Sequence, residues 1–288
     1  MALFQNGRNR YSAGVVSDVS RGSLARNQRS FLSTGGLVRP ARKKSSKANP
    51  VTALVPPGSP LHWYDMSDLD TLFQDVAAST PVTAHGQSVG RVNNKGSLTS
   101  EYLANAPEDS TRPTYDDQSF AYAGVTGDGS QGLDSTTTTW PGVSMPWAIG
   151  VVFATGTNNS DILMRWQNNN TAQVFRSATA KLDARSSGEI LVTTASVVDD
   201  TMYSVLFGID GTNFDATFSL ESGTQTVAPA TPVALSDSTT DGWMGESDSP
   251  SFGWQGTGFE FVVWGVDPAT ILTEWQTYTT AKWGITWA

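Results

Sequence analysis

Short segments in which large apolar side chains alternate with small or polar ones recur from residue 61 to the end of the chain. Segments 147–154 and 203–209 are clear examples, with Trp147, Ile149 and Val151 on one face of the first. A period of two places alternate side chains on opposite faces of a strand, so these segments predict β-strands. Because no long helical segments separate them, the pattern favours antiparallel sheets packed face to face.

The best-defined hairpin is predicted between residues 203 and 220. Phe214, Ala216 and Phe218 alternate with polar neighbours, which is typical of a half-buried strand. Asp210 and Gly211 stand at the centre of the connection to the preceding strand, and an Asp-Gly pair favours a tight turn. A further alternating row at 259–263 predicts a strand near the end of the chain.

One helix is predicted, at about 268–282. Asp267 can cap its free N–H groups, a proline follows at the first helical position, and Gly284 can end the helix in the left-handed conformation. Ile271, Trp275 and Tyr278 fall on one apolar stripe. A weaker helical turn is predicted from Ser67, with Leu69, Leu72 and Phe73 as its apolar side.

The composition agrees with a β-rich protein that has many turns. Of 288 residues, 38% are hydrophobic, only 16% are charged, and 27 are glycine. The absence of cysteine excludes a disulfide framework, cysteine-ligated zinc and a thiol nucleophile. The longest apolar run, 147–154, is far shorter than the roughly 20 residues of a membrane span, so no membrane partner is expected.

The charges divide the chain into two parts. Residues 1–50 hold ten basic residues and one acidic residue, whereas residues 51–288 hold eight basic and 26 acidic residues. Residues 51–60 are rich in proline, which predicts a stiff linker. We therefore expect an extended basic arm at 1–50, a linker at 51–60 and a sandwich at 61–288. The basic residues of the arm are Arg8, Arg10, Arg21, Arg26, Arg29, Arg39, Arg42, Lys43, Lys44 and Lys47.

The arm is too polar to fold alone. Its few apolar residues follow no period, so they cannot bury enough surface to offset the entropy of ordering. Three interpretations remain open: a solvated tail, an arm that lies extended on neighbouring acidic protein subunits, and a tail that neutralises nucleic-acid phosphates. The dispersed charges and sparse aromatic residues make nucleic acid the less favoured partner.

Motifs at the two ends of the sandwich resemble a known family. Trp63, Asp65, Ser67 and Asp68 follow the spacing Trp-x-Asp-x-Ser-Asp, and segments 89–96 and 112–115 read Val-Gly-Arg-Val-Asn-Asn-Lys-Gly and Arg-Pro-Thr-Tyr. Segments 258–264 and 272–285 resemble the last strand and the terminal helix of the same family. Together they are similar to the concanavalin A-like lectin/glucanase (LamG-type) domains of bacteriophage virion proteins. Asn94 stands where that pattern usually has Asp, and its Phe-Asp-Gly motif is missing.

The resemblance implies an all-β jelly-roll sandwich of two antiparallel sheets with a short C-terminal helix. It also implies a virion protein, either a capsid decoration protein or one associated with the head or tail. Its partners would be other virion proteins in the capsid, neck or tail, and further copies of itself within the particle. The virion is accordingly the expected location.

Catalytic patterns are not found. Retaining glucanases of this fold carry acids in a Glu-x-Asp-x-x-Glu pattern on one strand, because an acid and a nucleophile must flank the sugar bond. The nearest match, Glu246 and Asp248, lacks the third acid, and Glu260 is a lone acid between two phenylalanines. His62 and His85 are not in a nucleophile-elbow context. A non-enzymatic protein is therefore expected.

Two candidate binding sites remain. Asp128 and Asp134 flank a glycine-containing loop that could wrap Ca²⁺, although Asp-Gly is first of all turn chemistry; otherwise no cofactor is expected. Trp243 and Trp254, flanked by glycines, are the candidates for contact with a host glycan. The alternatives to a virion structural protein are thus a glycan-binding module of a tail fibre or spike, and a basic-armed shell protein that contacts packaged nucleic acid.

Overall fold

The computed structural model describes residues 54–98, 102–104, 112–134, 142–157, 161–166, 172–186, 188–229, 231–235, 242–243 and 254–288. The predicted basic arm and the first residues of the predicted linker lie outside these ranges. All the described residues belong to one unit that spans residues 45–288. No helix in this described part has the length and apolar character of a membrane span.

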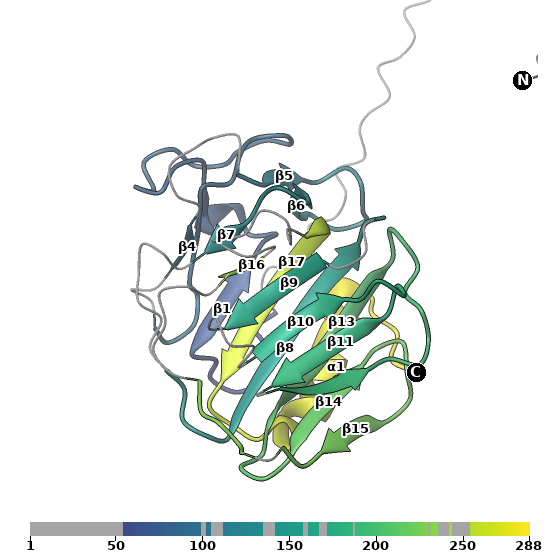
Figure 1. The fold of residues 1–288 in the computed structure, drawn as a ribbon. Helices are drawn as coiled ribbons and strands as arrows, with labels where there is room; N and C mark the ends of the chain where they lie inside the picture. The colour runs from purple at the N-terminus through teal and green to yellow at the C-terminus, as the bar shows by residue number, and fades with distance from the viewer. Residues whose placement is uncertain are drawn as a thin grey trace, which may run out of the picture. The chain divides into compact units, whose positions relative to one another are not determined.

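The first sheet has eight antiparallel strands, seven of them in the order β15-β14-β13-β8-β17-β6-β5. The eighth, β1, pairs with β17 beside β6, so these two short strands share one edge of the long β17 (Figure 1). The strands are β1 (His62–Asp65), β5 (Thr114–Asp116), β6 (Gly124–Asp128), β8 (Trp147–Thr155), β13 (Met202–Ile209), β14 (Phe214–Phe218), β15 (Thr224–Val227) and β17 (Gln255–Trp264).

The second sheet has nine antiparallel strands in the order β12-β11-β10-β9-β16-β7-β4-β3-β2. These strands are β2 (Leu72–Phe73), β3 (Arg91–Asn93), β4 (Tyr102–Ala104), β7 (Leu133–Asp134), β9 (Asp161–Trp166), β10 (Ala172–Arg176), β11 (Leu182–Ser186), β12 (Glu189–Val192) and β16 (Gly242–Trp243). The predicted sandwich of two antiparallel sheets with a C-terminal helix is therefore confirmed.

The main core lies between the two sheets. Each strand contributes alternate residues to it, such as Ile149, Val151 and Phe153 from β8 and Val174 from β10. The hairpin between β13 and β14 is as predicted: Asp210 Oδ1 accepts hydrogen bonds from the backbone N–H groups of Thr212 and Asn213, both at 2.7 Å.

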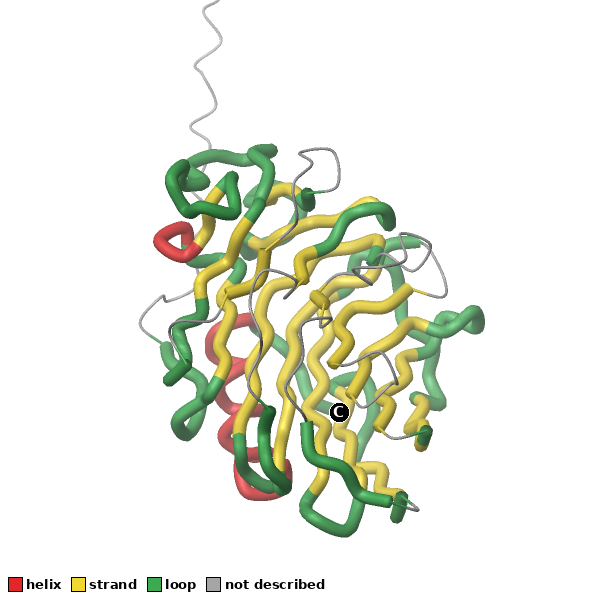
Figure 2. Tube along the Cα trace, turned by 60° about the vertical axis from the view of Figure 1, so that its left-hand side comes forward, coloured by secondary structure: helices red, strands yellow, loops and turns green. Residues whose placement is uncertain are grey.

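The helix α1 (Pro268–Trp283) covers the outer face of the first sheet (Figure 2). Its N-cap is Asp267, whose side chain accepts a hydrogen bond from Ala269, and Gly284 ends it at a φ of 67°. Trp275 packs edge-on against Trp264 of β17, with ring centroids 5.4 Å apart. Because of this second core, β8 is buried on both faces rather than on one.

The predicted helical turn near Ser67 is shorter than expected. A single 3-10 turn, η1 (Leu69–Thr71), starts after Asp68, whose carboxylate accepts a hydrogen bond from Asp70 N. Leu72 and Phe73 belong to β2, which pairs with β3. Pairing with a neighbouring strand therefore overrides the local helical pattern.

Candidate functional site

Two rows of cross-strand partners lie on the face of the second sheet away from the core; Figure 1 shows the strands β9, β10 and β11 that carry most of them. The first row consists of the consecutive cross-strand partners Gly242, Arg165, Gln173, Arg185 and Ile190. The second row consists of Ile162, Phe175, Asp183 and Val192. We call the four hydrogen-bonding residues Arg165, Gln173, Asp183 and Arg185 the outer-face cluster.

The cluster is organised around Phe175. The guanidinium carbon of Arg185 lies 4.5 Å from the centroid of the Phe175 ring, within the range of a cation–π contact. Arg185 Nη2 also donates to Asp183 Oδ2 at 3.1 Å. The side chain of Arg185 is 25% exposed, and Ile190 and Val192 beyond it are exposed as well. Arg165, Gln173 and Asp183 are buried, so solvent reaches the cluster at Arg185, on the β12 side.

Part of the hydrogen-bonding capacity of the cluster is unused. Gln173 Oε1, Asp183 Oδ1 and Arg185 Nε are buried atoms without a hydrogen-bond partner in the part of the chain that the structure describes. Leaving a buried polar atom unpaired costs about 1–3 kcal/mol, so such atoms usually have partners. Burial also raises the pKa of Asp183, although Arg185 opposes the shift. The arrangement is suited to a ligand that offers several hydrogen-bonding groups.

The sequence contains a signal for this cluster that the motif search missed. Gln173 lies in β10, and Asp183 and Arg185 lie two residues apart in the neighbouring β11, so all three fall on one face of the sheet. Aligning them requires the register of β10 and β11, and placing Arg165 of β9 beside them also requires the bulge between Val174 and Phe175.

A second cluster lies inside the protein, between β1, β17 and α1. Lys282 Nζ lies 2.8 Å from Asp65 Oδ2 and 3.0 Å from Glu260 Oε1, and all three side chains are at most 1% exposed. We call Asp65, Glu260 and Lys282 the buried ionic cluster. Three further donors reach Glu260: Trp63 Nε1 at 2.6 Å, Trp283 Nε1 at 2.6 Å and the hydroxyl of Tyr278.

The electrostatics of this cluster are set by burial and by its own charges. Burial alone would raise the pKa of Asp65, but Lys282 and Lys95 outweigh it and hold that pKa below its usual value. Burial raises the pKa of Glu260, and Lys282 offsets this only in part. Burial would lower the pKa of Lys282, but the two carboxylates raise it. The residues of this cluster come from the motifs at both ends of the sandwich.

The prediction that Trp243 and Trp254 contact a glycan is wrong. Both side chains are fully buried. Trp243 stacks on Phe261, with ring centroids 5.2 Å apart, and Trp254 packs edge-on against Phe153. The glycines in this region make room for the indoles inside the core: a Cβ on Gly258 would lie 2.7 Å from Trp243 Nε1.

The calcium candidate stays a prediction. Asp128 is exposed, and its Oδ1 accepts hydrogen bonds from Ser130 Oγ at 2.6 Å and Ser130 N at 2.9 Å, which lower its pKa. This is the geometry of a local turn. The side chain of Asp134 is outside the described residues. Within those residues, no group of three or more His, Cys, Asp or Glu side chains is arranged to hold a metal ion.

The other candidate residues are separated in the structure. His62 is buried against Trp166, and burial lowers its pKa to about 4. His85 Nδ1 lies 3.3 Å from Asp116 Oδ1 at the surface. Glu246 and Asp248, like the ten basic residues of the arm, lie outside the described ranges. Glu260 is enclosed by the indoles and the lysine described above, so a sugar cannot reach it.

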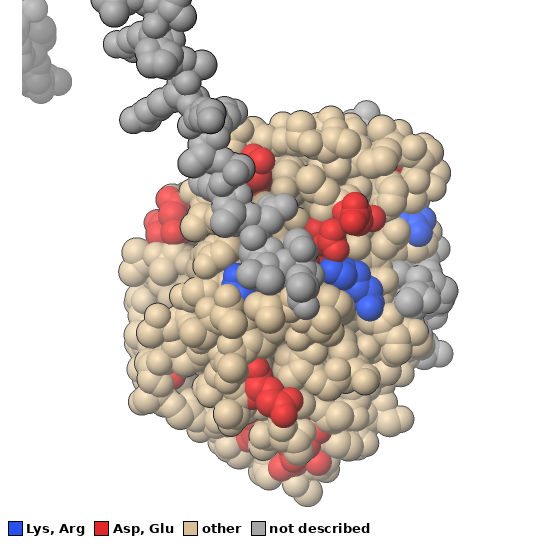
Figure 3. Space-filling view, turned by 180° about the vertical axis from the view of Figure 1, so that it is seen from behind, with Lys and Arg blue, Asp and Glu red and all other residues tan. Residues whose placement is uncertain are grey.

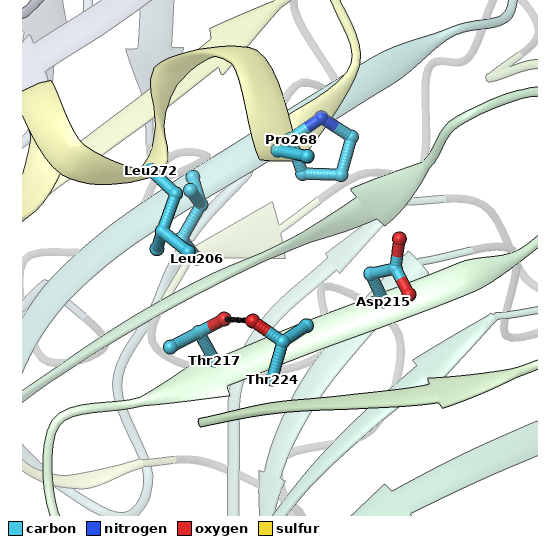
Figure 4. Close-up of a pocket in the computed structure, with 7 residues that line it drawn as sticks. Leu206, Asp215, Thr217, Thr224, Pro268 and Leu272 are labelled. Carbon is cyan, nitrogen blue, oxygen red and sulfur yellow. Dashed lines mark hydrogen bonds between the residues drawn. The ribbon is translucent and has the colours of Figure 1, made fainter. Parts of the chain in front are cut away.

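Hollows elsewhere in the described part are weaker candidates. A cavity of about 30 Å³ lies beneath the start of α1, where Pro268 and Leu272 face Leu206 and Asp215 (Figure 4), and it has room for about one water molecule. Two shallow hollows of about 580 and 510 Å³ are both lined in part by Ile285 and Thr286. Neither has a charged residue in its lining.

Comparison with known proteins identifies the fold. No family model and no curated protein matches the sequence. Among solved structures, a GH54 α-L-arabinofuranosidase aligns over 77% of this chain and 63% of its own, with a TM-score of 0.54 and 10% identity. A Trypanosoma rangeli sialidase in complex with sialic acid aligns over 80% of this chain but 34% of its own, with a TM-score of 0.50 and 8% identity. The chain is thus similar to part of each enzyme in its lectin-like β-sandwich fold.

Proposed function

We propose that this protein is a non-enzymatic, lectin-like component of a bacteriophage particle, and that its sandwich binds a glycan at the outer-face cluster. The observation that carries the glycan-binding part is the line of amide, carboxylate and guanidinium groups beside Phe175, with buried polar atoms that lack partners among the described residues. Sugars present many hydroxyl groups on a small apolar ring, so they are recognised by planar polar side chains next to an aromatic ring.

The charges of the cluster support binding rather than hydrolysis. Glycoside hydrolysis needs two carboxylates on either side of the scissile bond. The outer-face cluster contributes one, Asp183, which is already paired with Arg185. Similarity of fold to glycosidases does not transfer their activity.

The test of glycan binding is an array of host-surface glycans probed with the full chain. We expect Arg185→Ala to weaken binding at least tenfold, and Arg185→Lys to weaken it less, because lysine keeps the charge but loses the planar fork. Lys181→Ala is the matched control, a basic residue just before β11 but outside the cluster. Unchanged binding by Arg185→Ala would exclude this cluster as the site.

The basic arm is proposed to tether the sandwich to the particle. Ten basic residues against one acid in 1–50 suit acidic protein surfaces, whereas 26 acids in 51–288 disfavour association of the bodies with one another. The described surface in Figure 3 agrees with this, since its charged side chains form small separate patches, most of them acidic. The proposed partners are other virion proteins and neighbouring copies of this chain.

Deletion of residues 1–50 tests the tether. We expect the truncated sandwich to fold but not to join particles, and normal incorporation would end the proposal. The alternative, an arm that contacts packaged nucleic acid, predicts that the full chain loses affinity for DNA steeply as salt increases. A flat salt response would exclude that alternative.

A further inference from the structure

The buried ionic cluster has the composition and geometry of a self-reacting site. A lysine amine, a carboxyl group and a second carboxyl group meet inside the core, with the amine 2.8 Å from Asp65 Oδ2 and 3.0 Å from Glu260 Oε1. We propose that Asp65 and Lys282 form an intramolecular isopeptide bond, and that Glu260 transfers the protons for this reaction. The bond would join the first strand of the sandwich, β1, to its last helix, α1.

The site supplies the proximity that amide formation needs. Carboxylates and amines do not condense in water, because both are charged and solvated. Here the fold holds the two groups in contact, which replaces a bimolecular encounter with an intramolecular one. At most 1% of either side chain is exposed, so water is kept away from the amide once it has formed.

Asp65 is held in a suitable orientation. Its Oδ1 accepts hydrogen bonds from Ser67 N at 3.1 Å and Ser67 Oγ at 2.7 Å. These donors can stabilise the negative charge that develops on this oxygen when the amine attacks the carboxyl carbon. Oδ2 is the oxygen that leaves, and it faces both Lys282 and the amine of Lys95, which lies 3.5 Å away.

The reaction balances without any added reagent. The ammonium of Lys282 gives up two protons, its nitrogen forms a bond to Cγ of Asp65, and the bond from Cγ to Oδ2 breaks. Oδ2 leaves with the two protons as one water molecule, so an ammonium and a carboxylate become a neutral amide. Glu260 accepts protons from the nitrogen and passes them on.

Glu260 is positioned for this transfer. Trp63 and Trp283 each donate a hydrogen bond to one of its oxygens. The hydroxyl of Tyr278 donates to Glu260 and accepts a hydrogen bond from Lys282 Nζ at 3.0 Å. Burial raises the pKa of Glu260, which makes its carboxylate a better proton acceptor than an exposed one. The amide also relieves the cost of keeping two opposite charges in the core.

Lys95 is the internal competitor, and its geometry disfavours it. Its amine is 2.7 Å from Asp68 Oδ2 but 3.5 Å from Asp65 Oδ2, and 20% of its side chain is exposed. Amide formation needs the amine held in contact with the carboxyl group, and Lys95 is instead held against Asp68. The bond is therefore assigned to Lys282.

Intact-mass spectrometry of the denatured full chain tests the proposal. We expect the wild-type protein to be lighter than its sequence mass by one water, and a protease digest to contain one branched peptide that joins the segments around residues 65 and 282. Glu260→Gln, Lys282→Arg and Asp65→Ala should have their full sequence masses. Lys95→Arg is the matched control and should still lose one water.

Asp65→Asn separates the chemistry from the folding. An asparagine would form the same amide with loss of ammonia, so the linked product of this variant should have the same mass as linked wild-type protein. Near-ultraviolet circular dichroism, which reports on the buried tryptophans, checks that each variant is folded. A folded wild-type chain that keeps its full sequence mass after prolonged incubation would overturn the proposal, as would a branched peptide through Lys95.

Discussion

Asp65 and Glu260 are direct cross-strand partners in β1 and β17, and both are buried. Two like charges placed opposite each other in a sheet repel. Lys282 lies within 3.0 Å of both carboxylates and compensates them. Lys282 therefore links the first strand, the longest strand and the terminal helix electrostatically, and Lys95 assists at Asp65.

Replacing Lys282 with Met should destabilise the protein strongly. Relative to wild-type protein in which Asp65 and Lys282 are still an unlinked ion pair, removing one partner typically costs about 3–5 kcal/mol, because the remaining charges are left uncompensated. Part of the loss should return as the pH falls and the two carboxyl groups become protonated. Urea unfolding of Lys282→Met at pH 7 and pH 5 measures both effects, and equal losses at the two pH values would contradict this explanation.

His62 should make the protein sensitive to acid. Burial lowers the pKa of His62 to about 4, below its ordinary value of 6.5, so the unfolded state binds the proton more tightly. The stabilisation is present above pH 6.5 and is lost as the pH falls toward 4, by up to about 3 kcal/mol. His62→Phe should remove this pH dependence in urea unfolding, whereas the exposed His85→Gln should keep it.

Gly258 should not tolerate a methyl group. A Cβ at this position would lie 2.7 Å from Trp243 Nε1 and 2.8 Å from the ring carbon Cζ2. Overpacking of this kind costs about 1–3 kcal/mol. Gly265→Ala is the control, because its Cβ would meet Val143 at an ordinary 3.6 Å. Thermal unfolding of both variants measures the difference, and equal Tm values would show that the Trp243 ring can move aside.

Trp243→Ala should lower stability rather than remove a binding contact. The indole is fully buried, and truncating a buried tryptophan costs about 3–5 kcal/mol. A loss of glycan binding by this variant would therefore reflect unfolding. Denaturant unfolding checks this: a folded Trp243→Ala protein with unchanged stability and lost glycan binding would contradict the buried placement.

The cap of α1 should make a smaller contribution. Asp267 Oδ1 accepts a hydrogen bond from Ala269 N at 2.8 Å. Asp267→Ala should cost about 1 kcal/mol of stability. The exposed Glu274→Ala, in the same helix, should change the free energy of unfolding by less than about half of that.

The fold was predictable from the sequence because local patterns and tertiary packing agree there. Alternation predicts β8, β13 and β14, and the cap, proline and glycine predict α1. The early end of the turn near Ser67 and the burial of both faces of β8 were not predictable, because they depend on which strand or helix packs against each segment.

The candidate sites were harder to predict because their residues come together only through register and topology. Asp65 and Lys282 are 217 residues apart in sequence. Trp243 was misjudged because its neighbouring glycines suggested an exposed turn, whereas Gly258 on another strand makes space for it. The presence of Asn94 where the family pattern usually has Asp has a clear structural reason. The Asn94 Oδ1 accepts a hydrogen bond from Trp63 N, and its Nδ2 donates to Leu61 O and Leu98 O, which a carboxylate could not do.

The buried ionic cluster, which joins β1 and β17 to α1, has a consequence for synthesis in the cell. During translation, Asp65 leaves the ribosome long before Lys282 is made, and until then Asp65 has only the more distant Lys95 as a counter-charge and Glu260 lacks the amine of Lys282. Packing β1 and β17 together is therefore less favourable until Lys282 has been made. A premature stop shortly before residue 282 should therefore leave a chain that chaperones and proteases treat as unfolded.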